Sequence, residues 1–223
     1  MISLNVKALL AAASICMLLT APVFAAEPAP IWTGIYAGGH LGGAFGTDDY
    51  SASQGPRVSF NGLTGGVHAG YNFPKFSSVI LGVEGDFSWS QAKGTSTIVS
   101  PPDTVSITSS VNYLASVRGR VGLPVDDFLI YATAGVAWTE TKLTANIDQG
   151  AFTSQGSTTS VGYVVGGGIE TMLPHHLTGR IEGLYYGFGD SNLPVRDSTG
   201  ISGSTKISRD AAEVRAGLSY HFN

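Results

Sequence analysis

The chain has 223 residues, a net charge of -4, 43% hydrophobic residues and only 13% charged residues. Soluble domains carry about twice that share of charged residues, and a nucleic-acid-binding chain would show a basic patch, which is absent here. With 30 glycines and no long apolar run after the first residues, the sequence excludes helical membrane spans but not a barrel of membrane-spanning strands.

The first residues are typical of a secretory signal peptide. Lys7 precedes an apolar run over residues 8–19, which is short for a membrane helix. Small residues at Val23 and Ala25 fit the cleavage rule and place the cut after Ala25. We therefore predict a signal peptide over residues 1–25.

The single cysteine lies inside this run. Cys16 follows Ile15, whereas a lipoprotein signal needs a small residue before its cysteine, so lipidation is not expected. Residues 26–223 then form one exported domain without cysteine, and its stability cannot come from disulfides.

The next stretch, residues 31–46, reads "IWTGIYAGGHLGGAFG". A phosphate-binding glycine loop would be followed by a helix, and a flexible linker would lack the aromatic residues. Alternate positions instead separate an apolar set, with Leu41 and Phe45, from a set that carries Tyr36 and His40. This period of two predicts a strand with two unlike faces.

Seven further segments alternate in the same way. They cover residues 61–73, 79–89, 111–123, 128–138, 161–171, 179–187 and 212–222. Each has roughly the length that crosses a bilayer at a tilt. Every charge within these strands falls on the polar, glycine-spaced face, so we predict that the apolar face meets lipid and the polar face lines a narrow lumen.

The segments between the strands differ in length in an alternating order. The short ones are residues 74–78, 124–127 and 172–178, and the long polar ones are residues 47–60, 90–110, 139–160 and 188–211. This order predicts an up-and-down antiparallel barrel of eight strands, with short periplasmic turns and long external loops.

Aromatic residues stand near the predicted strand ends, as expected at the two membrane interfaces. One rim would carry Trp32, Phe73, Phe76, Phe128, Tyr220 and Phe222, and the other Phe45, Trp89 and Trp138.

Several of these motifs resemble those of one family. "WTGIYAGGHLGGAFG", "GYNF", "LGVEGDFSWS", "SVRGRVG" and "YATAGVAW" are similar to segments of the porin-family outer-membrane β-barrel proteins of Gram-negative bacteria, particularly the small surface-antigen or outer-membrane immunogenic type. The resemblance covers the whole chain after the signal. It also implies an assembly signal in the last strand, at Arg215, Gly217, Tyr220 and Phe222, with Asn223 following.

The polar faces of the predicted strands place nine charged residues in the lumen: Glu84, Asp86, Arg118, Arg120, Glu170, Arg180, Glu182, Glu213 and Arg215. An eight-stranded barrel is just wide enough for side chains to fill, and buried charges must be paired. We predict a paired network that holds the barrel together, with a narrow gated conduction path as the alternative. Glycines would leave room for the long side chains: Gly38, Gly42, Gly66, Gly166 and Gly168.

No metal, cofactor or catalytic site is predicted. His175 and His176 fall in a short turn, and His40 and His68 could approach each other but lack an evident third ligand. The predicted external loops contain no histidine, and the pair Asp48-Asp49 is interpreted as solvated loop residues. The protein is not expected to be an enzyme.

We therefore predict an integral outer-membrane barrel with a structural and surface-antigen role: envelope integrity, and loops for adhesion to a host or surface ligand. Its expected partners are outer-membrane lipid, lipopolysaccharide and the barrel assembly machinery, and no nucleic acid. Two alternatives remain: a narrow porin for small solutes, and an exported soluble ligand-binding barrel resembling a lipocalin, which would expose a large apolar belt to water.

Overall fold

A computed structural model describes residues 32–50, 57–74, 76–100, 103–147, 152–197 and 202–222. These residues form an all-β chain with strands β1 (Gly34–Tyr50), β2 (Arg57–Asn72), β3 (Ile80–Ser90), β4 (Lys93–Ser100), β5 (Asp103–Val125), β6 (Phe128–Ile147), β7 (Phe152–Leu173), β8 (Leu177–Asp197) and β9 (Ser202–His221). The predicted signal peptide lies outside the described residues. No helix in the described part of the chain is long and apolar enough to cross a membrane.

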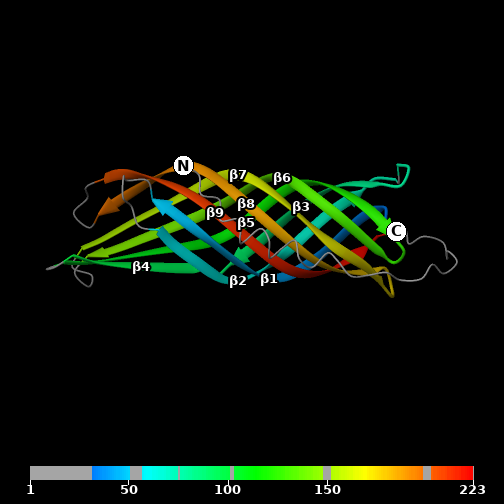
Figure 1. Ribbon diagram of the computed structural model, residues 1–223, viewed down its shortest axis with the longest axis horizontal. Helices are drawn as coiled ribbons and strands as arrows, with labels where there is room; N and C mark the ends of the chain where they lie inside the picture. Colours follow the sequence, from blue (N-terminus) through cyan, green and yellow to red (C-terminus); the bar gives the residue numbers. More distant parts are fainter. Residues whose placement is uncertain are drawn as a thin grey trace.

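The strands close into a barrel (Figure 1). All pairings are antiparallel, and β1 pairs with both β2 and β9. β3 and β4 act as one barrel strand, because only Gln91 and Ala92 separate them and both run beside β5. The Gln91 amide donates to the Leu63 carbonyl at 2.9 Å, and the Val111 amide donates to the Ala92 carbonyl at 3.0 Å, so the interruption stays bonded to both neighbours. The prediction of an eight-stranded antiparallel barrel is confirmed.

The two faces of the wall have the orientation predicted from the alternation. On β1, Tyr36 and His40 are buried in the lumen, whereas Leu41 and Phe45 are exposed, Leu41 to 75%. On the other strands the charged side chains that the sequence placed in the lumen lie inside and large apolar side chains lie outside, although some apolar residues such as Leu114 and Leu184 also point inward. Such an exposed apolar surface is stable in lipid and would not be stable in water.

One end of the barrel has short turns. Asp126 and Asp127 join β5 to β6, and residues 174–176 join β7 to β8. Asp126, His175 and His176 have positive φ, the left-handed conformation that Asp and His adopt more readily than most residues. β1 begins and β9 ends at this same end. Short turns and both termini mark the periplasmic side of an outer-membrane barrel.

The opposite, external end differs from the prediction. The segments expected to be long loops, residues 47–60, 90–110, 139–160 and 188–211, are mostly paired strand. Pairing runs on to Asp49↔Arg57, Ser100↔Asp103, Ile147↔Phe152 and Arg196↔Ser202. Strands β5 to β9 are 20 to 23 residues long, about twice what a bilayer requires. The hairpins therefore continue beyond the membrane and give the barrel the elongated shape seen in Figure 1.

Two residues predicted to face outward are buried. Trp32 is 1% exposed and packs against Ile80 and Leu129 at the periplasmic end of the lumen, so it does not belong to the aromatic girdle. Val111 points into the lumen because a register shift between Val111 and Tyr113 inverts the alternation of β5 above that point.

The remaining predicted girdle residues lie on the outer face, near the two rims. The exposed ones are Phe73, Phe76, Phe128, Tyr220 and Phe222 at the periplasmic rim, and Phe45 and Trp89 toward the external rim. Trp138 is half-buried.

Candidate functional site in the barrel lumen

The lumen charge network consists of the nine predicted residues. All nine are buried, and ion pairs connect them: Glu84, Asp86, Arg118, Arg120, Glu170, Arg180, Glu182, Glu213 and Arg215. They meet because each occupies an inward position on β3, β5, β7, β8 or β9, and the barrel places these strands around one narrow axis.

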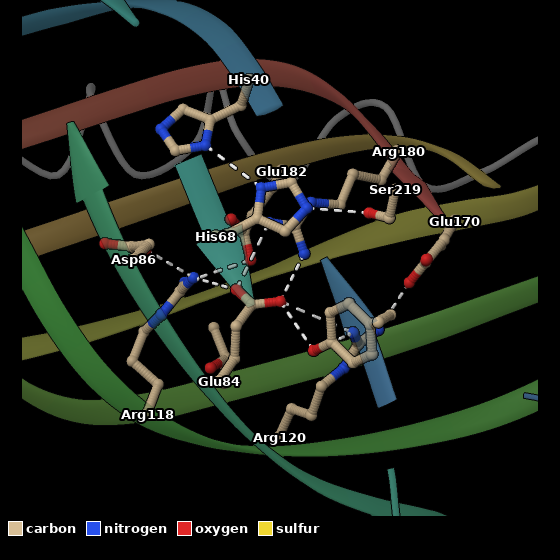
Figure 2. Close-up of polar contacts among 12 residues, drawn as sticks. His40, His68, Glu84, Asp86, Arg118, Arg120, Glu170, Arg180, Glu182 and Ser219 are labelled. Carbon is tan, nitrogen blue, oxygen red and sulfur yellow. Dashed lines mark hydrogen bonds and ion pairs between the residues drawn. The ribbon is translucent and has the colours of Figure 1, made fainter. Parts of the chain in front are cut away.

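Glu84 is the centre of the network (Figure 2). Arg118 donates to its Oε1, and Arg180 Nη1 donates to its Oε2 at 2.5 Å. Arg120 Nη1 lies 3.7 Å from the same Oε2. The Tyr36 hydroxyl also donates to Oε2, at 2.8 Å, and itself accepts from Arg120 at 2.9 Å. One carboxylate from β3 thus ties together β1, β5 and β8.

A second group lies around Arg215. Its Nη2 approaches Asp86 Oδ1 at 2.7 Å and Glu182 Oε2 at 2.6 Å, and its Nε donates to Glu182 at 2.7 Å. Arg118 contacts the same two acids, at 2.8 Å from Asp86 and 3.1 Å from Glu182. Two guanidinium groups therefore share two carboxylates, which satisfies the pairing that buried charges require.

The two remaining acids lie at opposite ends of the network. Glu170, toward the periplasm, accepts from Arg120 Nη2 at 2.8 Å and from Thr178 at 2.6 Å. Its Oε1 is 3.6 Å from His221 Nε2.

Glu213, toward the external side, accepts hydrogen bonds from Thr64 at 2.6 Å and from the Tyr186 hydroxyl at 3.0 Å. Arg215 Nη1 lies 3.7 Å from Glu213 Oε2, so neutral hydroxyl donors supply the shortest hydrogen bonds to this carboxylate.

His40 and His68 lie next to each other, with stacked rings and Nδ1 atoms 3.3 Å apart. His40 Nε2 is 2.7 Å from Ser88 Oγ. His68 Nε2 is 2.8 Å from Ser219 Oγ, as Figure 2 shows. Each ring is therefore held by a serine two strands away around the barrel, on β3 for His40 and on β9 for His68. Within the described part of the chain, no three His, Cys, Asp or Glu side chains converge as metal ligands.

The glycines that were predicted to leave room for Arg and Glu side chains do make room in the lumen, and aromatic side chains occupy part of that room. A Cβ at Gly42 would lie 2.7 Å from Arg215 Cβ, and one at Gly66 would lie 2.8 Å from His40 Nε2. A Cβ at Gly168 would lie 2.5 Å from the Ile181 carbonyl oxygen and 2.8 Å from the Tyr131 hydroxyl oxygen. The glycines thus admit aromatic rings as well as guanidinium groups.

An apolar lumen layer lies above the charge network, on its external side. It consists of Ala44, Phe60, Ala92, Val111, Leu114, Ala137, Val164, Leu184, Tyr186, Phe188 and Ala211. Its position follows from the chain: on β9, for example, Ala211 lies beyond Glu213 and Arg215 when counted from the periplasmic end.

A further buried polar group lies on the external side of this layer, and its residues fall in the segments predicted to be long loops. This outer ion-pair cluster consists of Asp48, Ser109, Thr141 and Arg209, all buried. Arg209 binds Asp48 through two bonds, Nε to Oδ1 at 2.5 Å and Nη2 to Oδ2 at 2.6 Å. Ser109 donates to Asp48 at 2.5 Å, and Arg209 also donates to Thr141. The interpretation of Asp48 as a solvated loop residue is wrong.

The residues of the predicted assembly signal lie on both faces of β9. Arg215 belongs to the lumen network, whereas Tyr220 and Phe222 are exposed outside, with their rings edge to face and 5.0 Å apart. Gly217 lies between them and Arg215 and is half-buried.

Comparison with known proteins identifies the family. The chain matches the family described as outer membrane protein beta-barrel domain over residues 8–222. It belongs to this family. As a member of the outer membrane protein β-barrel family, it is an integral protein of the outer membrane.

Its relatives are named for the same location. A 31 kDa outer-membrane immunogenic protein of Brucella melitensis is 29% identical and covers 92% of this chain and 93% of its own length. A 22 kDa outer membrane protein of Rhizobium leguminosarum is 30% identical over 88% of this chain and 81% of its own length. Among solved structures, the outer membrane protein OprG from Pseudomonas aeruginosa has a TM-score of 0.52 at 14% identity, covering 85% of this chain and 97% of its own, which shows a shared fold.

Proposed function

We propose that this outer-membrane barrel is a sealed structural protein that holds four long hairpins outside the cell. The filling of the lumen supports this proposal most strongly. Three successive layers of buried side chains occupy it: the lumen charge network, the apolar lumen layer and the outer ion-pair cluster. An ion crossing the barrel would have to displace paired charges and then pass an apolar layer, and both steps are costly.

A conductance measurement distinguishes the sealed barrel from the alternative of a narrow porin. Purified protein would be inserted into planar bilayers, and insertion would be verified by flotation of proteoliposomes and by the heat-dependent gel shift of a folded barrel. The sealed lumen predicts no conductance steps above the lipid baseline. Reproducible steps whose ion selectivity changes in Glu84→Gln would replace the structural role with that of a porin.

The soluble ligand-binding barrel is not supported, because the face that would meet water is apolar. We also propose that the protein is not an enzyme. The histidines of the described residues lie inside the lumen or, as His175 and His176, in a periplasmic turn, away from the external hairpins where a substrate would arrive. Exposure of those hairpins supports a surface-antigen role, in keeping with the immunogenic outer-membrane proteins it resembles.

Two partners follow from this proposal. The barrel assembly machinery would recognise the exposed aromatic pair Tyr220 and Phe222 of the last strand, and lipopolysaccharide would surround the external half of the wall. A Tyr220→Ala/Phe222→Ala variant should accumulate unfolded in the periplasm. Its assembly at the wild-type rate would contradict the first of these partners.

A further inference from the structure

The positive charges of the barrel divide sharply between inside and outside. Among the arginine and lysine side chains that the structure describes, the arginines are buried in the lumen, whereas Lys93 and Lys142 are exposed on the outer face. Both lysines lie on the external half of the wall, in β4 and β6.

These two lysines belong to one row of the sheet. Lys93 pairs with Ser110 of β5, and Ser110 pairs with Lys142 of β6. The lysines are therefore separated by two strand spacings, about 9.5 Å between their backbones. Ser110 lies between them, and Asn61 of β2 continues the row beside Lys93. The row thus presents two flexible ammonium groups around a hydroxyl, all on one face.

The row lies above the membrane interface. Lys93 is four residues beyond Trp89 along the wall, and Lys142 is four residues beyond Trp138. At about 3.3 Å per residue and a tilt of about 40°, this places the lysines roughly 10 Å outside the aromatic level. Aromatic belts lie at the headgroup boundary, so the lysines are at the height of lipid phosphates and sugars.

Within the described part of the chain, no ion pair neutralises the two lysines. The ion pairs of the described residues involve the five lumen arginines and His221, and neither lysine takes part. Glu140 lies two residues before Lys142 on β6, and it accepts a hydrogen bond from Asn112 at 2.7 Å. The exposed Asp210 lies on β9, across the barrel from β5. Among the described side chains, the wall around β5 thus carries two lysines beside Glu140, and the wall across the barrel carries Asp210.

We propose that Lys93, Ser110 and Lys142 bind the phosphate groups of lipopolysaccharide at the external surface of the membrane. Charge complementarity and height identify the partner: a phosphorylated glycolipid is the anion present at that level of the outer leaflet. This inference rests on the outer-membrane location of the chain and not on its sealed lumen, so a conductance result leaves it unaffected.

The test uses the full-length protein folded in detergent micelles and titrated with fluorescently labelled lipopolysaccharide. Lys93→Gln/Lys142→Gln should bind roughly 30-fold more weakly at low salt, as expected for the loss of two lysines facing an anionic surface. Lys93→Arg/Lys142→Arg keeps the charge and should bind like the wild type. Asp210→Asn on the opposite wall should change binding little. All of these side chains are exposed, and the heat-dependent gel shift verifies that each variant is folded.

Two further ligands test whether the bound group is a phosphate and whether it belongs to lipopolysaccharide. Enzymatically dephosphorylated lipopolysaccharide should bind to the wild type as weakly as the intact molecule binds to the double glutamine variant. Wild-type affinity for phosphatidylglycerol equal to that for lipopolysaccharide would overturn the assignment to the glycolipid. Unchanged binding in the double glutamine variant, or an equal change in Asp210→Asn, would overturn the site.

Discussion

Asp48 and Arg209 are 161 positions apart in the sequence and form a two-bond ion pair inside the barrel, on the external side of the apolar lumen layer. The pair joins β1 to β9, the first and last strands, at Asp48↔Arg209 in their register. Arg209 also lies over the Phe60 ring, 5.1 Å from its centroid, so β2 takes part as well. The closure of the barrel is thus secured beyond the membrane as well as within it.

Removing one partner of this pair should destabilise the barrel. Asp48→Asn or Arg209→Met leaves a buried unpaired charge, which costs about 3–5 kcal/mol of unfolding free energy. The double variant should lose less than the sum of the two single variants, because no charge is left alone. The measurement is denaturant unfolding in lipid vesicles. The exposed residue Asp126, as Asp126→Asn, is the control, and strictly additive losses would contradict the coupling.

Removing the charge of Glu84, at the centre of the lumen charge network, should also destabilise the barrel. Among the described residues, Glu84 is the carboxylate that pairs with Arg180, so Glu84→Gln leaves that guanidinium without a counter-charge. We expect the free energy of unfolding to fall by about 3–5 kcal/mol, and the double variant Glu84→Gln/Arg180→Met to recover part of this loss.

The comparison variant for Glu84 is Glu140→Gln, which changes a half-buried outward acid and should cost under about 1 kcal/mol. Equal losses in Glu84→Gln and Glu140→Gln, read from heat-dependent gel mobility, would show that the network does not stabilise the fold.

Adjacent glycines on β1 offer a matched test of lumen packing. A Cβ at Gly42 would meet Arg215 Cβ at 2.7 Å, whereas the nearest atom to a Cβ at Gly43 is 3.9 Å away. Gly42→Ala should therefore lower the free energy of unfolding by about 1–3 kcal/mol through overpacking. Gly43→Ala faces lipid and should leave the free energy of unfolding nearly unchanged. The denaturant midpoints of unfolding of the two variants measure this difference in stability. A larger loss at Gly43 would mean that the faces of β1 are assigned the wrong way round.

The direction of insertion can be tested by labelling whole cells. Ser157→Cys in β7 is exposed in the row of Lys142, beyond the membrane, whereas Asp127→Cys lies in a short turn at the other end. The only natural cysteine is Cys16, in the predicted signal peptide, so background labelling should be low. A membrane-impermeant maleimide should label Ser157→Cys on intact cells and Asp127→Cys only after permeabilisation. The reverse pattern would invert the barrel in the membrane.

The sequence predicted the membrane part of the barrel well, because lipid on one side and a packed lumen on the other impose a strict period of two. The adjacent residues His40, which is buried, and Leu41, which is exposed, illustrate how a single residue step changes the environment completely. The same alternation brought Glu84 and Arg215 to one face, although only the closed barrel shows which acid meets which base.

Beyond the membrane, the alternation of apolar and polar residues disappears from the sequence. Water surrounds the outer face there, so Ser and Thr occupy both faces, and a paired strand such as the start of β7 has the composition of a loop. For this reason Asp48 and Arg209 were not recognised as lumen residues. Val111 was placed on the wrong face because a single register shift cannot be read from composition, and Trp32 because a buried and an interfacial tryptophan look alike in sequence.

The extension of the strands also determines what an antibody or receptor meets at the cell surface. In a paired hairpin, neighbouring residues of one strand point to opposite sides, so the accessible surface combines alternate residues from adjacent strands, such as Lys93 and Ser110. A binding partner would therefore recognise a folded surface assembled across strands. A linear peptide cut from one strand would reproduce only every second contact and none of those from its neighbours.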